Sequence, residues 1–313
     1  MRIAVGDVGG TNARFALAEV AEGSVRALAE PVVLAARDHA GLAQAWRAFG
    51  ETLGEPLPRH AAFGLAGPVT GGAVRFVNSP WVVDPATLND ALGLDNSLLL
   101  NDFGAMAHAA HALPPEHLVH IFGPDIALPE SGAISVIGPG TGLGVAVLQR
   151  LACGPVVLET EGSHIHFAPL DPDEARVCAV LAAQHGRVSV ERLVSGPGLG
   201  EIIRTFDPSD RRDDAALWAA AVAGEEPRAL DLFLACYGAA VGDLSLAHGA
   251  LGVVLTGGLT ARLRQALPAS RFHPRFCDKG RYRARMEAIP IKLITHPQPG
   301  LFGAAAAFAK DFT

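Results

Sequence analysis

Short apolar runs alternate with longer helical patterns through the first third of the chain. Residues 3–8 form an apolar-rich run that ends in a Gly-Gly turn, and residues 14–18 form a second run soon afterwards. This spacing predicts two strands joined by a tight turn. Residues 39–53 place apolar side chains at three-to-four spacing, which predicts a helix. The alternation predicts an α/β layer with ligand contacts at the carboxyl ends of its strands.

The same patterns assign the rest of the chain. They predict strands at residues 25–34, 60–66, 74–77, 96–102, 134–139, 145–148, 156–159, 253–256 and 291–295. They predict helices at residues 103–111, 173–184, 198–205, 214–247 with a break near Gly224, and 300–310. Asp84 stands before Pro85 as the N-cap residue of a further helix does. We expect residues 74–77 to pair back on the strand at 60–66.

Three glycine-rich turns each follow a predicted strand, at Gly9-Gly10, Gly140-Thr141-Gly142 and Gly257-Gly258. We expect the first pair to take positive φ, which a short hairpin demands, and the missing Cβ atoms let a ligand approach the N–H groups. Thr11 and Asn12 add a hydroxyl and an amide at the tip. One such turn alone is equally an ordinary hairpin. Three of them suggest several backbone surfaces converging on one polyphosphate.

The lysines restrict how such a phosphate is held. The chain has only Lys279, Lys292 and Lys310, so neither a Walker P-loop nor the early strand lysine of a protein kinase can be accommodated. Phosphate is therefore expected to be held by backbone N–H groups, hydroxyls and a cation. Asp7 stands where the first strand ends, and a carboxylate beside phosphates requires a cation between the two anions.

Composition and charge exclude several classes of protein. Charged residues make up 18% of the 313 residues and the net charge is −7, which argues against disorder and against a nucleic-acid partner. The longest apolar stretches, 215–223 and 301–309, are shorter than the roughly 18 residues of a membrane span. The first residues carry no leader pattern. We therefore expect a cytoplasmic protein without a membrane segment.

The four cysteines support that location. Cys153, Cys178, Cys236 and Cys277 lie far apart and form no C-x-x-C pair. Structural zinc and a disulfide framework are both disfavoured, and four buried or half-buried thiols are expected in a reducing compartment.

Several polar side chains follow predicted strands and form candidate chemistry. Asn101 and Asp102 end a strand of the layer that carries Asp7, although a carboxylate in this position is also a common helix N-cap. Glu161 and His164 lie in a glycine loop, and His164 with His166 could share a metal, but no third ligand of matching spacing is nearby.

Glu191 completes this acceptor-rich set, with a surface carboxylate as its alternative interpretation. Carboxylates and amides suit sugar hydroxyls, which donate as well as accept hydrogen bonds, whereas an acidic substrate would require Arg. The set therefore indicates a neutral polyhydroxyl substrate.

The chain divides into two predicted domains. Pro114-Pro115 interrupts the pattern, and each half begins with a strand, a glycine turn and a strand, as a duplicated nucleotide-binding fold would. We expect a smaller α/β domain of residues 1–113 plus 300–313, which includes the C-terminal helix, and a larger α/β domain of residues 114–299.

At this point the chain closely resembles the bacterial glucokinases, of the hexokinase group within the actin-like ATPase superfamily. The resemblance covers nearly the whole length and is specific because six motifs recur in order. They are Gly6-Asp7-Val8-Gly9-Gly10-Thr11-Asn12-Ala13-Arg14, Leu100-Asn101-Asp102-Phe103, Gly138-Pro139-Gly140-Thr141-Gly142-Leu143-Gly144, Glu161-Gly162-Ser163-His164, Glu191-Arg192-Leu193-Val194-Ser195-Gly196-Pro197-Gly198 and Thr256-Gly257-Gly258. The cysteine-rich zinc motif of the ROK sugar kinases is absent from the sequence.

The resemblance implies a two-domain actin-like fold with an interdomain cleft that closes on the sugar, and phosphorylation of glucose at its 6-hydroxyl by Mg-ATP. It implies that Asp102 is the general base and that glucose is bound by Asn101, Asp102, Glu161, His164 and Glu191. Asn78, in the polar stretch Asn78-Ser79-Pro80-Trp81, is expected to close over the sugar as a further ligand. ATP is implied to contact Gly6, Asp7, Gly9, Gly10, Thr11, Asn12, Gly140, Thr141, Gly142, Gly257 and Gly258. Asp7 would hold Mg²⁺ through water, and the family resemblance also implies a homodimer.

Three other classes remain to be weighed. A sugar sensor would keep the pocket and lack the base, yet Asp102 is present. An actin-like ATPase that acts on protein partners would not need Glu161, His164 and Glu191. A dinucleotide oxidoreductase would need G-x-G-x-x-G before a helix, whereas here a strand follows the first turn too soon.

Overall fold

The chain forms two compact units in a computed structural model that describes residues 1–76 and 79–313. The first unit comprises Met1–Pro114 and His296–Thr313, and the second comprises Pro115–Thr295. The C-terminal segment of the first unit begins at His296, slightly before the predicted boundary at residue 300. Thr295 still belongs to the second unit, where its N–H donates to His117 O. Which ligands each unit binds stays a prediction.

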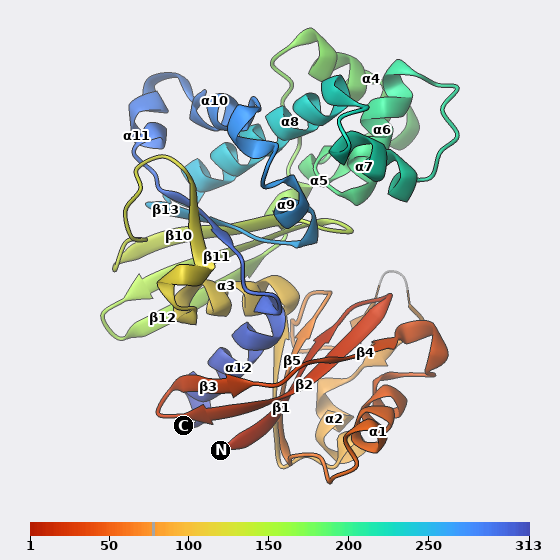
Figure 1. Cartoon of the computed structure of the whole chain (residues 1–313), viewed down its shortest axis with the longest axis vertical. Helices are drawn as coiled ribbons and strands as arrows, with labels where there is room; N and C mark the ends of the chain where they lie inside the picture. Colours follow the sequence, from red (N-terminus) through yellow and green to blue (C-terminus); the bar gives the residue numbers. More distant parts are fainter. Residues whose placement is uncertain (77–78) are drawn as a thin grey trace. The chain divides into compact units, whose positions relative to one another are not determined.

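The first unit is built on a six-stranded mixed sheet with the order β3-β2-β1-β5-β8, in which β4 also pairs with β2 (Figure 1). β1 pairs antiparallel with β2 and parallel with β5, and β5 pairs parallel with β8. The strands are β1 (Arg2–Val8), β2 (Asn12–Ala21), β3 (Ser24–Leu28), β4 (Val32–Ala35), β5 (His60–Leu65) and β8 (Asn96–Asn101). The parallel strands place the carboxyl ends of β1, β5 and β8 at one edge.

Helices cover both faces of this sheet. Alternate residues of β1 point to opposite faces, so Ala4 and Val8 pack with α1 while Ile3 and Val5 pack with α12. The helices are α1 (Leu42–Leu53), α2 (Pro85–Leu92), α3 (Asp102–Ala112), α12 (Pro299–Phe312) and the short 3₁₀ helix η1 (Ala36–Asp38). The expected packing of the C-terminal helix on the first domain is confirmed, because a Cβ on Gly303 would lie only 1.8 Å from the backbone oxygen of Ala105 in α3.

Two predictions for the first unit are wrong. The single strand expected at 25–34 is two strands, β3 and β4, which are separated around Pro31, a residue with no N–H for a ladder. Within the described part of the predicted strand 74–77, residues 74–76 do not pair back on β5, because β1 and β8 already occupy both of its edges. Instead β6 (Val74–Arg75) pairs antiparallel with β7 (Val82–Val83). The N-cap at Asp84 is confirmed, since its Oδ1 accepts from Ala86 N–H at 3.0 Å.

The second unit holds a second six-stranded mixed sheet, with the order β12-β11-β10-β13-β14-β9. β10 pairs antiparallel with β11 and parallel with β13, which repeats the arrangement around β1. Its strands are β9 (Leu118–Phe122), β10 (Gly132–Pro139), β11 (Leu143–Leu151), β12 (Gly154–Thr160), β13 (Gly252–Leu255) and β14 (Ile291–Ile294). Cys153 lies in the turn between β11 and β12 and is exposed, so the expectation that every thiol is at least half buried is wrong there.

The helices of the second unit enclose a large apolar core against its sheet. They are α4 (Pro172–His185), α5 (Val190–Leu193), α6 (Gly196–Phe206), α7 (Asp214–Val222), α8 (Pro227–Ala247), α9 (Gly258–Leu263), α10 (Phe272–Cys277) and α11 (Arg283–Glu287). The short 3₁₀ helices are η2 (Pro115–His117), η3 (Gly162–His164), η4 (Leu267–Ala269) and η5 (Gly280–Tyr282). The predicted helix 214–247 is two helices, α7 and α8, and Gly224 between them has a φ of 84°.

Helix α8 is the core helix of this unit. Its 21 residues are long and apolar enough to cross a membrane by length and composition. However, 78% of its most apolar 18-residue stretch is buried inside the structure. Its uncharged run 232–242, between Asp231 and Asp243, is longer than 215–223 and 301–309, so the expectation that those two are the longest apolar stretches is wrong.

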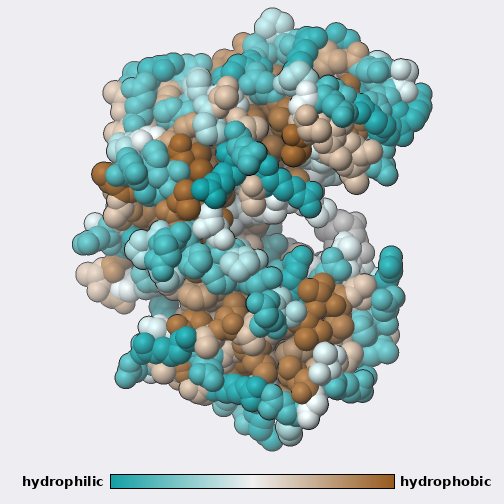
Figure 2. Space-filling model, in the orientation of Figure 1, coloured by the Kyte–Doolittle hydropathy of each residue, from teal (hydrophilic) through white to brown (hydrophobic). Residues whose placement is uncertain are grey.

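Figure 2 shows that hydrophilic residues cover most of the viewed face, with local hydrophobic areas between them.

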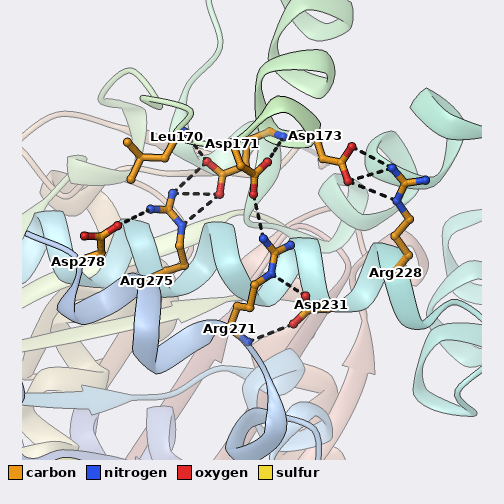
Figure 3. A network of polar contacts seen from close by, with 9 residues as sticks. Leu170, Asp171, Asp173, Arg228, Asp231, Arg271, Arg275 and Asp278 are labelled. Atoms are coloured by element: carbon orange, nitrogen blue, oxygen red, sulfur yellow. Dashed lines mark hydrogen bonds and ion pairs between the residues drawn. The ribbon is translucent and has the colours of Figure 1, made fainter.

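A network of charged residues joins α4, α8 and α10 (Figure 3). Glu174 is fully buried and accepts two hydrogen bonds at 2.9 Å and one at 3.1 Å from the guanidinium of Arg275 in α10. Asp171 caps α4 by accepting from Glu174 N–H at 2.8 Å. Arg271 lies between Asp171 and Asp231, at 2.8 and 2.6 Å. These bonds fix the start of α4 against two neighbouring helices.

Candidate active site

The turn between β1 and β2 differs from the expected tight hairpin. Neither Gly9 nor Gly10 is among the residues with positive φ in the described chain, so that prediction is wrong. The reason is length: Val8 pairs with Ala13, which leaves four residues in the turn, and the two-residue geometry that demands positive φ is not needed. Gly9 N–H donates to Asn12 O at 2.9 Å. A Cβ on Gly9 would meet that oxygen only at 3.6 Å, so nothing within the turn excludes a side chain.

Asp7 forms an ion pair that the sequence analysis missed. The β1–β2 register places Asp7 opposite Arg14, and Arg14 Nη1 donates to Asp7 Oδ2 at 3.1 Å. Burial raises the pKa of Asp7, and the charge and hydrogen bond of Arg14 oppose that effect. The Asp7 side chain is 26% exposed. Counting back from the turn would have found this pair, because the two residues lie equally far from its closing positions.

Gly6 lies inside β1 rather than in the turn. A Cβ on Gly6 would lie 2.6 Å from Cδ1 of Phe63 and 3.2 Å from the ring of Phe15. Its missing side chain therefore makes room for two core aromatic rings, which gives Gly6 a packing role in the strand that leads to the turn.

Asn101 and Asp102 lie at the start of α3, directly after β8. Asn101 is the N-cap residue: its Oδ1 accepts from Phe103 N–H at 2.9 Å, and its Nδ2 donates to Gly67 O at 3.1 Å. Asp102 is the first residue of the helix, and its Oδ1 also accepts from Phe103 N–H at 2.9 Å. Asn101 rather than Asp102 is thus the N-cap residue of α3. The partial positive charge at the start of the helix favours the ionised form of the Asp102 carboxylate.

Strand register brings these residues of the first unit to one edge. Val8 of β1 lies level with Leu65 of β5, which lies level with Asn101 of β8. The β1–β2 turn and Asp102 therefore both follow residues at the same level of the sheet. A Cβ on Gly64 would lie 3.7 Å from Cα of Asp102 and 3.9 Å from the backbone oxygen of Gly6. This confirms the expected placement of polar groups at carboxyl ends of strands.

The turn between β10 and β11 contains Gly140, Thr141 and Gly142 and is held from outside. Gly140 N–H donates to Gly142 O at 2.7 Å within the turn. Gly196 N–H, at the start of α6, donates to Gly140 O at 2.7 Å. Leu143 N–H donates to Glu191 Oε2 at 3.0 Å. Thr141 is exposed at the tip, so the turn presents a small hydroxyl and backbone groups to solvent.

Three of the predicted sugar ligands come together in the second unit. His164 Nε2 lies 3.7 Å from Glu161 Oε2 and 3.9 Å from Glu191 Oε1. Glu161 precedes η3, His164 ends it, and Glu191 comes from α5. Their side chains are 62%, 54% and 32% exposed, so this group of three residues is open to a ligand.

His166 does not join that group as a metal ligand. It is exposed and forms an isolated backbone bridge with Ser189. In the described residues, no three His, Cys, Asp or Glu side chains are grouped so that they could hold a metal ion.

The third glycine turn has a different form from the other two. β13 ends at Leu255 and α9 begins at Gly258, so this turn leads from a strand into a helix. Gly257 has a φ of 90°, and a Cβ there would lie 2.7 Å from Pro139 O. Both its conformation and its close approach to β10 require glycine. Asn78, the remaining predicted sugar residue, lies outside the described residues.

Comparisons with known proteins agree with these motifs. The family model described as Glucokinase matches residues 4–311. A glucokinase from Zymomonas mobilis is 49% identical over 321 residues, which cover 100% of this chain and 99% of the relative. The crystal structure of a glucokinase from an Antarctic psychrotroph is 33% identical, with a TM-score of 0.83 and 98% of each chain covered.

A more distant structure extends the likeness of fold. The ROK family glucokinase from Streptomyces griseus, solved in complex with glucose and AMPPNP, is 18% identical, with a TM-score of 0.66 and coverage of 98% of this chain and 99% of that one. The predicted α/β class is confirmed as a mixed α/β fold of the kind found in glucokinases and ROK sugar kinases. With a family model that spans nearly the whole chain and a relative at 49% identity, the chain belongs to the glucokinase family.

Proposed function

We propose that this chain is a glucose kinase that transfers the γ-phosphoryl group of Mg-ATP to the 6-hydroxyl of D-glucose. Membership of the glucokinase family supports the reaction class. The observation that carries the proposal is the group formed by Glu161, His164 and Glu191, whose polar atoms lie within 4 Å of one another in pairs around His164. The two carboxylates accept hydrogen bonds and the imidazole can also donate one, so the group offers both kinds of partner to a polyol.

Asp102 is the proposed general base. It lies at the start of α3, on the edge of the sheet that also carries the β1–β2 turn. Phosphoryl transfer requires positioning and charge stabilisation more than covalent chemistry from the protein. A carboxylate that accepts the proton of the 6-hydroxyl as the oxygen attacks phosphorus would supply the remaining acid–base step. Asn101 beside it would bind a neighbouring sugar hydroxyl.

The proposed sugar site also includes Glu161, His164 and Glu191, with Asn78 as an additional ligand. We infer that these residues and the Asn101–Asp102 pair act on the same glucose molecule, which requires the two units to face each other across an interdomain cleft, as in the actin-like ATPase superfamily. Closure of that cleft on the sugar would exclude water, a smaller competing nucleophile.

The nucleotide is proposed to lie along the three glycine turns. The β1–β2 turn would offer Gly9, Gly10, Thr11 and Asn12 to the phosphates, the β10–β11 turn would offer Gly140, Thr141 and Gly142, and Gly257 with Gly258 would border the adenosine. The exposed Thr11 and Thr141 at the tips of the first two turns, beside partly exposed glycines, support this role. Gly6 would act indirectly, through the strand that positions the first turn.

Asp7 fits a magnesium ion held through water. Its carboxylate is partly exposed, and Asp7 is the second-last residue of β1, beside the proposed phosphate turn. Mg²⁺ keeps several waters and binds few carboxylates, so one such group is sufficient, and the bound ion would neutralise charge on the transferring phosphates. Arg14 would hold the Asp7 carboxylate in orientation from the neighbouring strand.

The test is coupled phosphorylation of glucose by Mg-ATP, comparing the native chain with Asp102→Asn. The variant keeps the shape of the side chain and cannot accept the proton. We expect kcat to fall by a factor of about 10² to 10⁴, the usual share of a general base, while glucose binding by calorimetry survives. Equal turnover in both proteins would refute the role of Asp102, and no turnover in the native chain would refute the function.

We also propose a cytoplasmic location and a homodimer. The first rests on the redox preference of four free thiols and the second on family resemblance. Sedimentation velocity of the purified chain decides the oligomer, because a sedimenting mass near 32.5 kDa would show a monomer.

A further inference from the structure

One segment of the second unit, residues 189–196, contacts both the proposed sugar site and the proposed phosphate turn. Its carboxylate at Glu191 faces two ways. Oε1 lies 3.9 Å from His164 Nε2, on the side of the sugar ligands. Oε2 accepts the hydrogen bond of Leu143 N–H at 3.0 Å, at the end of the β10–β11 turn. The two oxygens of one carboxylate therefore join two parts of the site.

The same segment holds the other end of the turn. Gly196 N–H donates to Gly140 O at 2.7 Å, and Trp218 Nε1 donates to Gly196 O at 2.6 Å. Trp218 is 6% exposed and packs edge-on against Phe233 of α8, so this end is fixed to the core. The segment therefore holds the turn by two hydrogen bonds. In the bond from Leu143 N–H to Glu191, the acceptor is a side-chain carboxylate that a bound ligand could also contact.

We propose that Glu191 couples the binding of glucose to the binding of the nucleotide. When its carboxylate binds a sugar hydroxyl, it also fixes the position of the proposed phosphate turn. The turn in return fixes the position of the carboxylate. This inference rests on the proposed function. Coupling of this kind is reciprocal, so glucose and nucleotide each strengthen the binding of the other through the same side chain. Sugar binding would thereby prepare the turn before the phosphoryl group is transferred.

Gly142 is the positioning residue of this device. A Cβ on Gly142 would lie 2.4 Å from Glu191 Oε2, so a methyl group there must push the carboxylate away from Leu143 N–H. Gly140 offers a matched control two residues away, because a Cβ there meets no atom within 4 Å and its φ is not positive. The two substitutions add the same methyl group to the same turn, and only one displaces the carboxylate.

The first experiment measures glucose binding without nucleotide, by calorimetry, for the native chain, Gly142→Ala and Gly140→Ala. The displaced carboxylate would lose its charge-assisted hydrogen bond to the sugar, so we expect Gly142→Ala to weaken glucose binding about tenfold or more. Gly140→Ala should stay within about twofold of the native affinity. Thermal unfolding of each variant confirms that it is folded.

The second experiment measures Mg-ADP binding without sugar, which a residue that only bound glucose would not alter. Glu191→Gln keeps an oxygen that accepts from Leu143 N–H, whereas Glu191→Ala does not. We expect Glu191→Ala to weaken Mg-ADP binding about tenfold and Glu191→Gln to stay close to the native value. This pair also carries the test if Gly142→Ala does not fold.

The outcomes separate this inference from the proposed function. If the native chain binds glucose and Gly142→Ala binds it equally well, the coupling is overturned while the kinase assignment stands. Equal Mg-ADP affinities for Glu191→Gln and Glu191→Ala likewise overturn it. A native chain that binds no glucose overturns the proposed function, and the coupling with it.

Discussion

Removing the Glu174 carboxylate should destabilise the second unit far more than removing an exposed carboxylate of the same network. Glu174 is fully buried, and the side chain of its partner Arg275 is only 10% exposed. Glu174→Ala would leave the guanidinium of Arg275 with Asp278, whose nearest carboxylate oxygen is 3.7 Å away and whose side chain is half exposed. Most of the charge of Arg275 would then lie in the interior without a close partner.

The magnitude follows from this geometry. The Glu174 carboxylate accepts three hydrogen bonds from Arg275 and a fourth from Leu170 N–H at 2.7 Å. Removing one partner of a buried ion pair costs about 3–5 kcal/mol, because the other charge stays buried. For a unit of this size each kcal/mol lowers Tm by about 2–4 °C, so the expected loss in Tm is about 6–20 °C.

Asp173→Ala provides the matched control. Asp173 pairs with Arg228 in the same network, but their side chains are 37% and 65% exposed, so the expected cost is about 0–1 kcal/mol (Figure 3). A double variant, Glu174→Met with Arg275→Met, should recover most of the loss, since apolar side chains of similar volume can replace a buried pair.

The assay is thermal unfolding by calorimetry, with urea unfolding as a second measure of the free energy of unfolding. Glu174→Ala and Asp173→Ala melting at the same temperature would refute the reasoning, because burial would then make no difference to the pair. Failure of the double variant to recover stability would show that the hydrogen bonds, rather than an unpaired charge, carry the effect.

Three further predictions concern the first unit. Burial lowers the pKa of His108 to about 4, whereas an unfolded histidine has a pKa near 6.5. As pH drops from about 6.5 toward 4, the unfolded chain therefore binds the proton first and the free energy of unfolding falls. His108→Gln should flatten this pH dependence of the melting temperature. Gly303→Ala would place a Cβ 1.8 Å from Ala105 O, and urea unfolding should show a loss of about 3 kcal/mol as α12 moves off α3. Arg14→Met removes the group that opposes the burial effect on Asp7, so the pKa of Asp7 should rise further in an NMR titration. Because the Arg14 side chain is 42% exposed, the stability loss should be about 1 kcal/mol or less.

Local patterns predicted the elements that depend on neighbouring residues. The strands on either side of each of the first two glycine turns, the helix N-cap at Asp84 and the C-terminal helix all follow from periodicity and caps that lie within a few positions. The placement of Asp102 and the first turn at one sheet edge also followed, because parallel strands align their carboxyl ends.

Contacts between distant segments could not be predicted in this way. Nothing near Glu191 in the sequence indicates that its carboxylate accepts from Leu143 N–H, forty-eight positions earlier. Residues 74–75 form β6 and do not pair with β5, because both edges of β5 are occupied, which is a property of the whole sheet. The Gly9-Gly10 motif predicts positive φ only if the hairpin turn is short, whereas the turn has four residues and neither glycine takes positive φ.

The two sheets repeat one another, yet only in the first does the strand that leads into the glycine turn carry a carboxylate near its end. The orders β3-β2-β1-β5-β8 and β12-β11-β10-β13-β14 correspond strand by strand, and the β1–β2 turn corresponds to the β10–β11 turn. Asp7 precedes the last residue of β1, and Gly138 precedes the last residue of β10. A Cβ on Gly138 would lie 2.0 Å from the backbone oxygen of Thr256, so the close approach of the β13 end leaves no space for any side chain there. The strand before the turn can therefore carry a carboxylate in the first unit, where we propose that Asp7 holds a cation, whereas at Gly138 of the second unit the backbone of Thr256 takes that space.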